Sequence, residues 1–154
     1  MYNNPKTKAI LNQLVADLSQ FSAVIHQTHW YLRGSGFLTM HPKMDDLMDD
    51  VNAQLDEVAE RLITVGGAPF STLGEFAANT RIPDQTGTFE IASDDRLATL
   101  VLGYRYLSNV YAEGIRVAGE ESDDVSADVF TGAKAGIEKT IWMLEAHLGK
   151  APGL

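Results

Sequence analysis

Apolar residues recur every three or four positions through four long stretches of this chain, the spacing of amphipathic α-helices. The first stretch covers residues 6–32, with Asn4 and Pro5 as the expected cap and first-turn residues. The second covers residues 39–65, with Pro42 in its first turn and two glycines directly after its end. The pattern predicts an all-α protein.

The third and fourth stretches begin at the acidic clusters 93–95 and 122–124. Ser and Asp side chains accept hydrogen bonds from the free N–H groups of a first helical turn, so both clusters predict helix starts. The apolar stripe of the fourth stretch comprises Val125, Val129, Ile137, Ile141, Leu144 and Leu148. Short connections join helix one to two and helix three to four, so each pair is expected to form an antiparallel hairpin.

A long connection rich in turn residues, 66–92, joins the two hairpins and contains one short helical patch at residues 72–78. This connection is long enough to cross the length of a helical bundle. The expected fold is therefore an all-α, ferritin-like four-helix bundle, with a short extra helix in the long crossover between helices two and three. We find no internal repeat or low-complexity tract, so residues 1–154 are expected to form a single domain.

The chain carries a formal net charge of −9 and contains no cysteine. The charge disfavours bulk attraction to nucleic acid or to an anionic membrane, and it favours cations. The lack of cysteine excludes disulfides, thiolate metal sites and cysteine nucleophiles. The first residues lack the apolar run of a signal peptide and no stretch is long enough to span a bilayer, so a cytoplasmic protein is expected.

The second predicted helix has an unusual charge pattern, with seven acids between residues 45 and 60 and no Lys or Arg among them. Three pairs of these acids stand four residues apart, where like charges destabilise a helix by about 0.2–0.5 kcal/mol per pair. A bound cation is the simplest compensation. Four potential ligands share one side of this helix, in a stripe about 100° wide beside the apolar one: His41, Asp45, Asp56 and Glu60.

Asp45 and Asp56 stand eleven residues apart. This separation is about 16 Å along a helix axis, so one copy of the helix cannot bring both side chains to the same ion. If the helix packs antiparallel on its symmetry mate, each dimer makes two equivalent sites. Each site then gathers His41 and Asp45 from one subunit and Asp56 and Glu60 from the other. Carboxylates with imidazole and without sulfur suit Fe(II), Mn(II) or Zn(II).

Three of the four histidines, His26, His29 and His41, lie between residues 26 and 41. His29 falls on the apolar stripe of the first helix and His26 falls at its edge. Taken alone, a histidine on such a stripe is more often a buried, hydrogen-bonded core residue than a ligand. The acidic stripe of the second helix favours the metal-ligand interpretation.

Several motifs together resemble the Dps family (DNA-binding protein from starved cells), especially its peroxide-resistance and ferritin-like branch. They are HxxHW at 26–30, RGSGF at 33–37, HPKMDD at 41–46, DEVAERL at 56–62, DDVSADV at 123–129 and IWMLEAHLGKAP at 141–152. The similarity covers nearly the whole chain. It implies a hollow, roughly spherical dodecamer that binds Fe(II), oxidises it preferentially with hydrogen peroxide, and stores ferric mineral in its cavity.

The resemblance also implies a ferroxidase site at each two-fold interface of the shell. Its ligands would be His29, His41 and Asp45 of one subunit, with Asp56 and Glu60 of the mate. The family pattern makes His26 an outer ligand or proton relay and packs Trp30 beside the site. The chain has no Glu-x-x-His motif for a dimetal centre inside one subunit, which favours the interface site.

Two further acidic groups have both a simple and a functional interpretation. Asp124 and Asp128 open the fourth helix, where acids favour the helix N-terminus through its dipole. The family pattern places the matching acids in three-fold pores through which Fe(II) enters, and we assign them both roles. Asp46, Asp49 and Asp50 are expected to face the cavity and nucleate mineral, or else to form an ordinary solvated face.

DNA-binding members of the family usually carry a lysine-rich flexible tail, whereas the first thirteen residues here hold only Lys6 and Lys8. A shell with a charge of −9 on every chain would repel duplex DNA. Two alternatives to an iron store stay open. A nucleoid DNA-binding protein predicts a salt-sensitive gel shift, and a non-catalytic interaction shell predicts metal-dependent assembly without oxidation.

Overall fold

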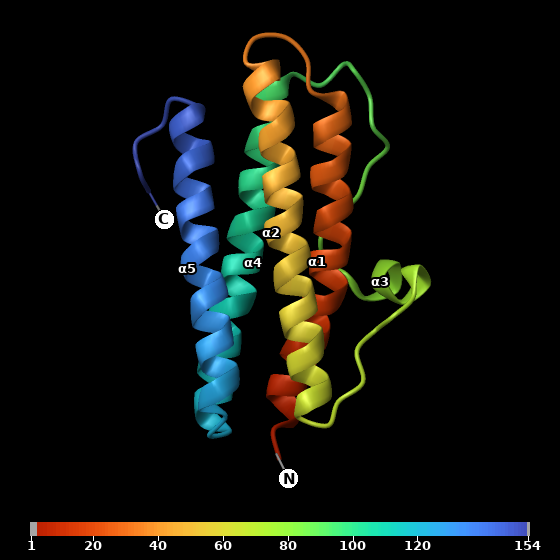
Figure 1. The fold of residues 1–154 in the computed structure, drawn as a ribbon, viewed down its shortest axis with the longest axis vertical. Coiled ribbons are helices and arrows are strands. Elements are labelled where there is room, and N and C mark those ends of the chain that lie inside the picture. The colour runs from red at the N-terminus through yellow and green to blue at the C-terminus, as the bar shows by residue number, and fades with distance from the viewer. Residues whose placement is uncertain (1–2, 154) are drawn as a thin grey trace.

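A computed structural model describes residues 3–153 of the chain (Figure 1). Five helices and no strand occur among the described residues. The helices are α1 (Pro5–Tyr31), α2 (Phe37–Thr64), α3 (Leu73–Asn79), α4 (Ser93–Glu120) and α5 (Asp124–His147). Residues 1, 2 and 154, the outermost positions of the expected domain, lie outside this description.

The four long helices form a bundle of two antiparallel hairpins, α1 with α2 and α4 with α5 (Figure 1). Further contacts join α1 to α4 and α2 to α5. The crossover leaves the end of α2 at one end of the bundle and reaches the start of α4 at the other, and α3 lies outside the bundle against α1. This confirms the expected all-α, ferritin-like architecture with a short helix in the crossover.

No described helix is both long and apolar enough to span a bilayer.

Large aromatic and aliphatic side chains from all four long helices fill the centre of the bundle. The rings of Phe21 and Tyr104 meet edge to face, with centroids 4.7 Å apart. Gly103 allows this approach, because a Cβ there would overlap the Phe21 ring. Helices α1 and α4 therefore pack closely at this level because one residue lacks a side chain.

Helix α2 begins at Phe37, two residues before the expected start, so Pro42 lies inside the helix and not in its first turn. The reason lies in the preceding turn, where Gly34 and Gly36 adopt φ values of 91° and 79° that other residues rarely adopt. These glycines reverse the chain quickly and let the helix start early. Pro42 has no N–H, so it cannot complete the helical hydrogen bond to the carbonyl of Leu38.

The prediction that Val125 belongs to the core stripe of the last helix is wrong, because its side chain is 54% exposed. Phe130, which the predicted stripe omits, is fully buried instead. The first turn of α5 directs a polar side chain inward, because Ser126 hydrogen-bonds the buried cap residue Asp123. A polar network thus replaces apolar packing at this end of the bundle.

The crossover is fastened to the bundle by one buried carboxylate, Asp17 of α1. It accepts hydrogen bonds from the Thr80 hydroxyl at 2.9 Å, the Arg81 backbone N–H at 2.8 Å and the Tyr106 hydroxyl at 2.6 Å. Just before this point, Thr72 caps α3, which lies where the sequence predicted a short helical patch. These contacts hold the crossover against α1 and α4.

Candidate metal centre

Two histidines from neighbouring helices hold each other through backbone carbonyls. Nδ1 of His29 lies 2.7 Å from the carbonyl oxygen of His41, and Nδ1 of His41 lies 2.9 Å from the carbonyl oxygen of His29. Their rings stack with centroids 3.7 Å apart. A carbonyl can only accept, so each neutral ring carries its proton on Nδ1 and keeps a lone pair on Nε2. Metal-binding histidines commonly have this arrangement.

Asp45 lies beside His29 at the same end of the α1–α2 hairpin. Its Oδ1 lies 3.7 Å from Nε2 of His29, with side-chain exposures of 59% and 12%. This separation is too long for a direct hydrogen bond. Two ligands at about 2.1 Å from one ion stand about 3–3.5 Å apart, so a small contraction lets both atoms contact the same metal. We call His29, His41 and Asp45 the histidine half-site.

Asp56 and Glu60 lie further along α2 and are exposed. At about 1.5 Å per residue, Asp56 is about 16 Å along the axis from Asp45, and the two share nearly the same angular position on the helix. Among the described residues, one chain holds no group of three or more His, Asp or Glu side chains placed to bind a metal. One copy of the chain thus presents two separate ligand sets. We call Asp56 and Glu60 the carboxylate half-site.

Aromatic side chains border the histidine half-site. His26 is exposed and stacks on Trp30 with ring centroids 4.1 Å apart, and its own ring lies 6.1 Å from that of His29. Phe37 stacks on His41 at 4.8 Å. The sequence interpretation missed Phe37, although its position one helical turn before His41 was the signal that could have identified it. The His41 ring therefore stacks on both Phe37 and His29.

The three acids of α2 expected to nucleate mineral, Asp46, Asp49 and Asp50, are all exposed. A carboxylate oxygen of Asp46 lies 3.7 Å from Lys43 Nζ, a surface ion pair. Asp50 and Lys43 both line a groove of about 430 Å³ between α2 and α5. The structure does not bring these three acids into a cluster with the histidine half-site.

The acids at the start of α5 divide into two kinds. Asp124 and Asp128 are exposed, one turn apart. Asp123 is 1% exposed and accepts hydrogen bonds from Asn4, Arg61 and Ser126. Burial raises the pKa of Asp123, but the hydrogen bonds from Ser126, Arg61 and Asn4 outweigh it and hold this pKa below its ordinary value. Asp123 is therefore a structural acid, and its two exposed neighbours are available to solvent.

Residues 8–154 match the family model described as the ferritin-like domain. The chain is 51% identical to the DNA protection during starvation protein of Streptococcus suis over 148 residues, covering 96% of this chain and 86% of that one. It is 46% identical to the protein of the same name from Listeria innocua over 150 residues, covering 97% of this chain and 96% of that one.

Solved structures are similar in both fold and sequence. Dps from Listeria monocytogenes aligns with a TM-score of 0.94 at 45% identity and covers 99% of both chains. Dps from Listeria innocua soaked with zinc aligns with a TM-score of 0.92 at 46% identity, covering 96% of this chain and 99% of that one.

Proposed function

The chain belongs to the ferritin-like family and, within it, to the DNA protection during starvation (Dps) proteins, and on that premise we propose that it is an iron-sequestering ferroxidase. It oxidises Fe(II), preferentially with hydrogen peroxide, and stores the ferric mineral in a hollow dodecamer. Iron storage and DNA protection are general properties of this family. The proposal adds three specific points: that the protein oxidises Fe(II), that hydrogen peroxide is the preferred oxidant, and which residues bind the iron.

The observation that carries the proposal is the pair of reciprocal hydrogen bonds between His29 and His41. Both Nδ1 atoms are engaged by backbone carbonyls, so both Nε2 atoms are left as acceptors without further rearrangement. A core histidine with a purely structural role would need no such matched pair. Asp45, whose Oδ1 is 3.7 Å from Nε2 of His29, supplies negative charge beside the nitrogen ligands.

The ligand set becomes complete when α2 packs antiparallel on α2 of a second subunit, with the two-fold axis near Asp50. The histidine half-site of one subunit then faces the carboxylate half-site, Asp56 and Glu60, of its mate. This packing also brings counter-charges into the acidic face of α2, in the form of bound iron. Two equivalent sites result for each pair of subunits.

The chemistry follows from the charges of these ligands. Carboxylates favour Fe(III) over Fe(II), because they stabilise the ion of higher charge. Two Fe(II) ions each give up one electron, and one hydrogen peroxide takes both electrons with two protons and leaves as two water molecules. Paired delivery of electrons avoids release of hydroxyl radical. His26, next to His29, acts as an outer ligand or proton relay, and Trp30 packs beside it.

The same nitrogen and oxygen ligands also suit Zn(II) and Mn(II). The similar Listeria innocua Dps has been solved after soaking with zinc and after soaking with cobalt, which supports such an exchange of metals in this group of proteins. Competition by Zn(II) would therefore inhibit Fe(II) oxidation by the present chain.

Acids outside the ferroxidase site guide and collect iron in this proposal. Asp124 and Asp128 line three-fold pores through which Fe(II) enters, which is compatible with their exposure. Asp49 and Asp50 face the cavity and nucleate mineral. Asp46 contributes less to nucleation, because Lys43 already offsets its charge.

We infer that DNA protection by this chain comes from removal of Fe(II) and peroxide, and not from coating DNA. The relatives are named for DNA protection, but the present chain has a net charge of −9. A shell with that charge repels duplex DNA, most strongly at low ionic strength, where salt screens the charges least. A gel-shift titration with linear DNA in low salt tests this point, and a salt-sensitive shift would favour the nucleoid-binding alternative.

The proposed function is tested by loading the protein with Fe(II) without oxygen, adding a pulse of hydrogen peroxide, and separating the products by size. We expect iron to co-elute with a particle of about twelve subunits, in an amount far above two ions per site. Iron that stays in the small-molecule fraction would show that the sites are structural or hold another metal. In that case the interaction-shell alternative would replace the ferroxidase.

A further inference from the structure

Arg96 of α4 is a buried cation with incomplete hydrogen bonding. Only 4% of the residue is exposed. Its Nη2 donates to the carbonyl oxygen of Thr88, and the centre of its guanidinium group lies 5.2 Å from the centroid of the Tyr31 ring. Its Nε is buried and has no hydrogen-bond partner. Buried arginine donors of this kind are rare, because an unpaired buried donor is costly.

No carboxylate among residues 3–153 lies within ion-pair distance of the Arg96 guanidinium, although arginines 61, 105 and 116 all have one. Burial lowers the pKa of Arg96 from its ordinary value, but a guanidinium keeps its proton in proteins. The positive charge is therefore held inside the protein without a negative partner from the described chain.

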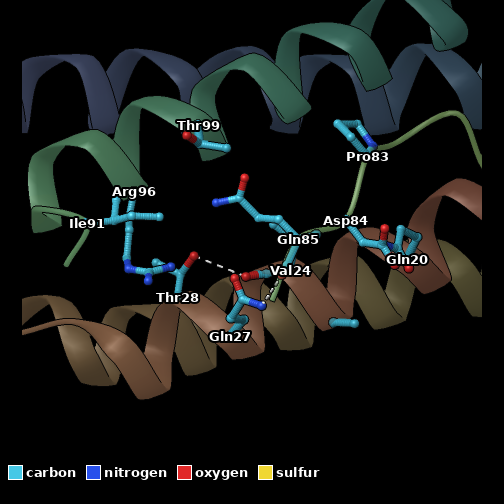
Figure 2. Close-up of a pocket in the computed structure, with 11 residues that line it drawn as sticks. Gln20, Val24, Gln27, Thr28, Pro83, Asp84, Gln85, Ile91, Arg96 and Thr99 are labelled. Atoms are coloured by element: carbon cyan, nitrogen blue, oxygen red, sulfur yellow. Dashed lines mark hydrogen bonds between the residues drawn. The ribbon is translucent and has the colours of Figure 1, made fainter. Parts of the chain in front are cut away.

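Arg96 lines a pocket of about 310 Å³ between α1, the crossover and α4 (Figure 2). In Figure 2 its side chain reaches from α4 toward Thr28 on α1 at one end of the pocket. Gln85 of the crossover extends into the middle of the pocket. The Gln27 amide donates to the Gln85 backbone carbonyl at 2.7 Å, which ties the crossover to α1 at this place.

Of the ten other lining residues, five are neutral and polar, four are apolar and one is acidic. Amide and hydroxyl groups come from Gln20, Gln27, Gln85, Thr28 and Thr99. The one carboxylate of the lining, Asp84, lies at the end opposite Arg96 in Figure 2. The pocket thus has a positive group at one end, the Gln85 amide in the middle and a negative group at the far end.

We propose that this pocket binds a small oxyanion, either a carboxylate or phosphate, with Arg96 as its charge partner. An arginine presents parallel N–H donors that match two oxygens of such a group. The side-chain amides of Gln20 and Gln85 can bind further oxygens without adding charge, whereas the Thr28 and Thr99 hydroxyls already donate to backbone carbonyls. The volume is at the lower end of small-molecule pockets, which run from about 300 to 1,000 Å³, so the ligand is small.

The site is separate from the proposed ferroxidase. None of the lining residues comes from α2, which carries His41, Asp45 and the carboxylate half-site. The inference does not depend on iron chemistry, and it can be tested on metal-free protein. Failure of one proposal leaves the other unaffected.

The test is equilibrium dialysis of metal-free, full-length protein against labelled phosphate and, separately, labelled acetate, at constant ionic strength in chloride. We expect saturable binding of one anion per chain. Arg96→Gln should weaken this binding at least tenfold. Arg96→Lys, which keeps the charge but lacks the fork of donors, should weaken it by a smaller factor.

Two variants keep the test decisive if Arg96 substitutions disturb folding. Ala23→Leu places a larger side chain at an exposed position that lines the pocket, and it should abolish binding while Arg96 stays intact. Asp84→Asn removes the only lining carboxylate and should tighten anion binding severalfold. Arg116→Gln, at an exposed arginine already paired with Glu113, is the control for loss of one positive charge and should bind as wild type.

Binding of phosphate alone assigns the site to phosphate, and binding of acetate alone assigns it to carboxylates. Absence of saturable binding to both anions would overturn the proposal and leave a pocket filled by water. Equal binding by wild type, Arg96→Gln and Ala23→Leu would also overturn it, because the anion would then bind elsewhere. Weaker anion binding in Asp84→Asn would also contradict the proposal, because removal of a negative charge should strengthen an anion site.

Discussion

A histidine binds a metal through a ring nitrogen that carries no proton, and here the backbone decides which nitrogen that is. The carbonyls of His41 and His29 each accept a hydrogen bond from the Nδ1–H of the other residue. This exchange also fixes both ring planes, because a donated hydrogen bond restricts rotation about the side-chain bonds. The two residues therefore form one unit, and a change at either disturbs both.

We predict that His41→Ala lowers the rate of Fe(II) oxidation at least about tenfold, because it removes one ligand and the partner that orients the other. Stopped-flow absorbance of ferric products after mixing with peroxide measures this rate. The matched control is His147→Ala, an exposed histidine at the end of α5, which should oxidise Fe(II) as wild type does. Equal rates in all three proteins would contradict the assignment of His41.

Adjacent aspartates at the start of α5 differ because one is buried and one is exposed. Asp123 is joined to Arg61 by a 2.6 Å ion pair, and Asp124 faces solvent. We predict that Asp123→Asn lowers stability by about 3 kcal/mol, since one partner of a buried pair is removed. For a chain of this length that is a fall in Tm of about 6–12 °C. Asp124→Asn, measured beside it by circular dichroism, should change Tm by little.

The stabilisation by Asp123 should depend on pH. Its pKa lies below the ordinary value in the folded protein, so its contribution is complete above the unfolded pKa of about 3.9. The contribution is lost as the pH falls through the lower folded pKa. The Tm difference between wild type and Asp123→Asn should thus be constant from about pH 7 to 5 and shrink below about pH 4. A difference that grows on acidification would show that the carboxylate is not the stabilising form.

At the scale of elements, helix packing depends on where side chains are absent. Gly103 of α4 faces the Phe21 ring of α1, where a Cβ would overlap ring atoms, whereas nothing lies within 4 Å of a Cβ added to Gly132 of α5. The two glycines are indistinguishable by helical propensity. Only their positions in the bundle give them different roles.

We predict opposite effects for alanine at these two glycines. Gly103→Ala should destabilise the protein by about 1–3 kcal/mol, because the core ring of Phe21 has to move. Gly132→Ala should stabilise it by about 0.5–1 kcal/mol, because alanine loses less backbone entropy in a helix. Thermal melting of both variants tests the pair, and stabilisation by both would mean that α1 and α4 are not in close contact at Gly103.

At the scale of the whole molecule, the proposed ferroxidase site is divided between subunits. The histidine half-site and the carboxylate half-site are separated by about 16 Å along α2, so one chain cannot close the site alone. In this proposal, oligomerisation is part of the catalytic mechanism, and bound metal offsets the repulsion among the acids of α2 in the assembly.

We predict that mixing Asp45→Asn and Asp56→Asn subunits restores part of the activity that each variant lacks. In a mixed pair, one end combines both altered carboxylates and the other end combines both intact ones. Denaturing and refolding the two variants together, followed by a peroxide-driven oxidation assay, measures the recovery. Each variant refolded alone is the control. Hybrids that assemble but stay inactive would show that the ligands do not come from two subunits.

The sequence by itself determined the four long helices and their hairpin order, because helical periodicity depends on residues three or four positions apart and the order depends on the lengths of the connections. It also identified the short helix of the crossover, whose capping residues are local. It placed the start of α2 two residues late, because the early start depends on positive φ values at Gly34 and Gly36 that helical periodicity does not encode.

Only the tertiary structure decided the roles of residues whose partners are distant in the chain. The reciprocal bonds of His29 and His41 need α1 and α2 side by side, and the burial of Asp123 needs Asn4, 119 residues away. In the sequence, Arg96 is indistinguishable from an ordinary exposed charge near a helix start. Its burial against α1 and the crossover is visible only in the tertiary structure. Burial and hydrogen-bond partners depend on contacts between segments that are distant in the sequence. The periodicity within one segment does not indicate which other segment packs against it.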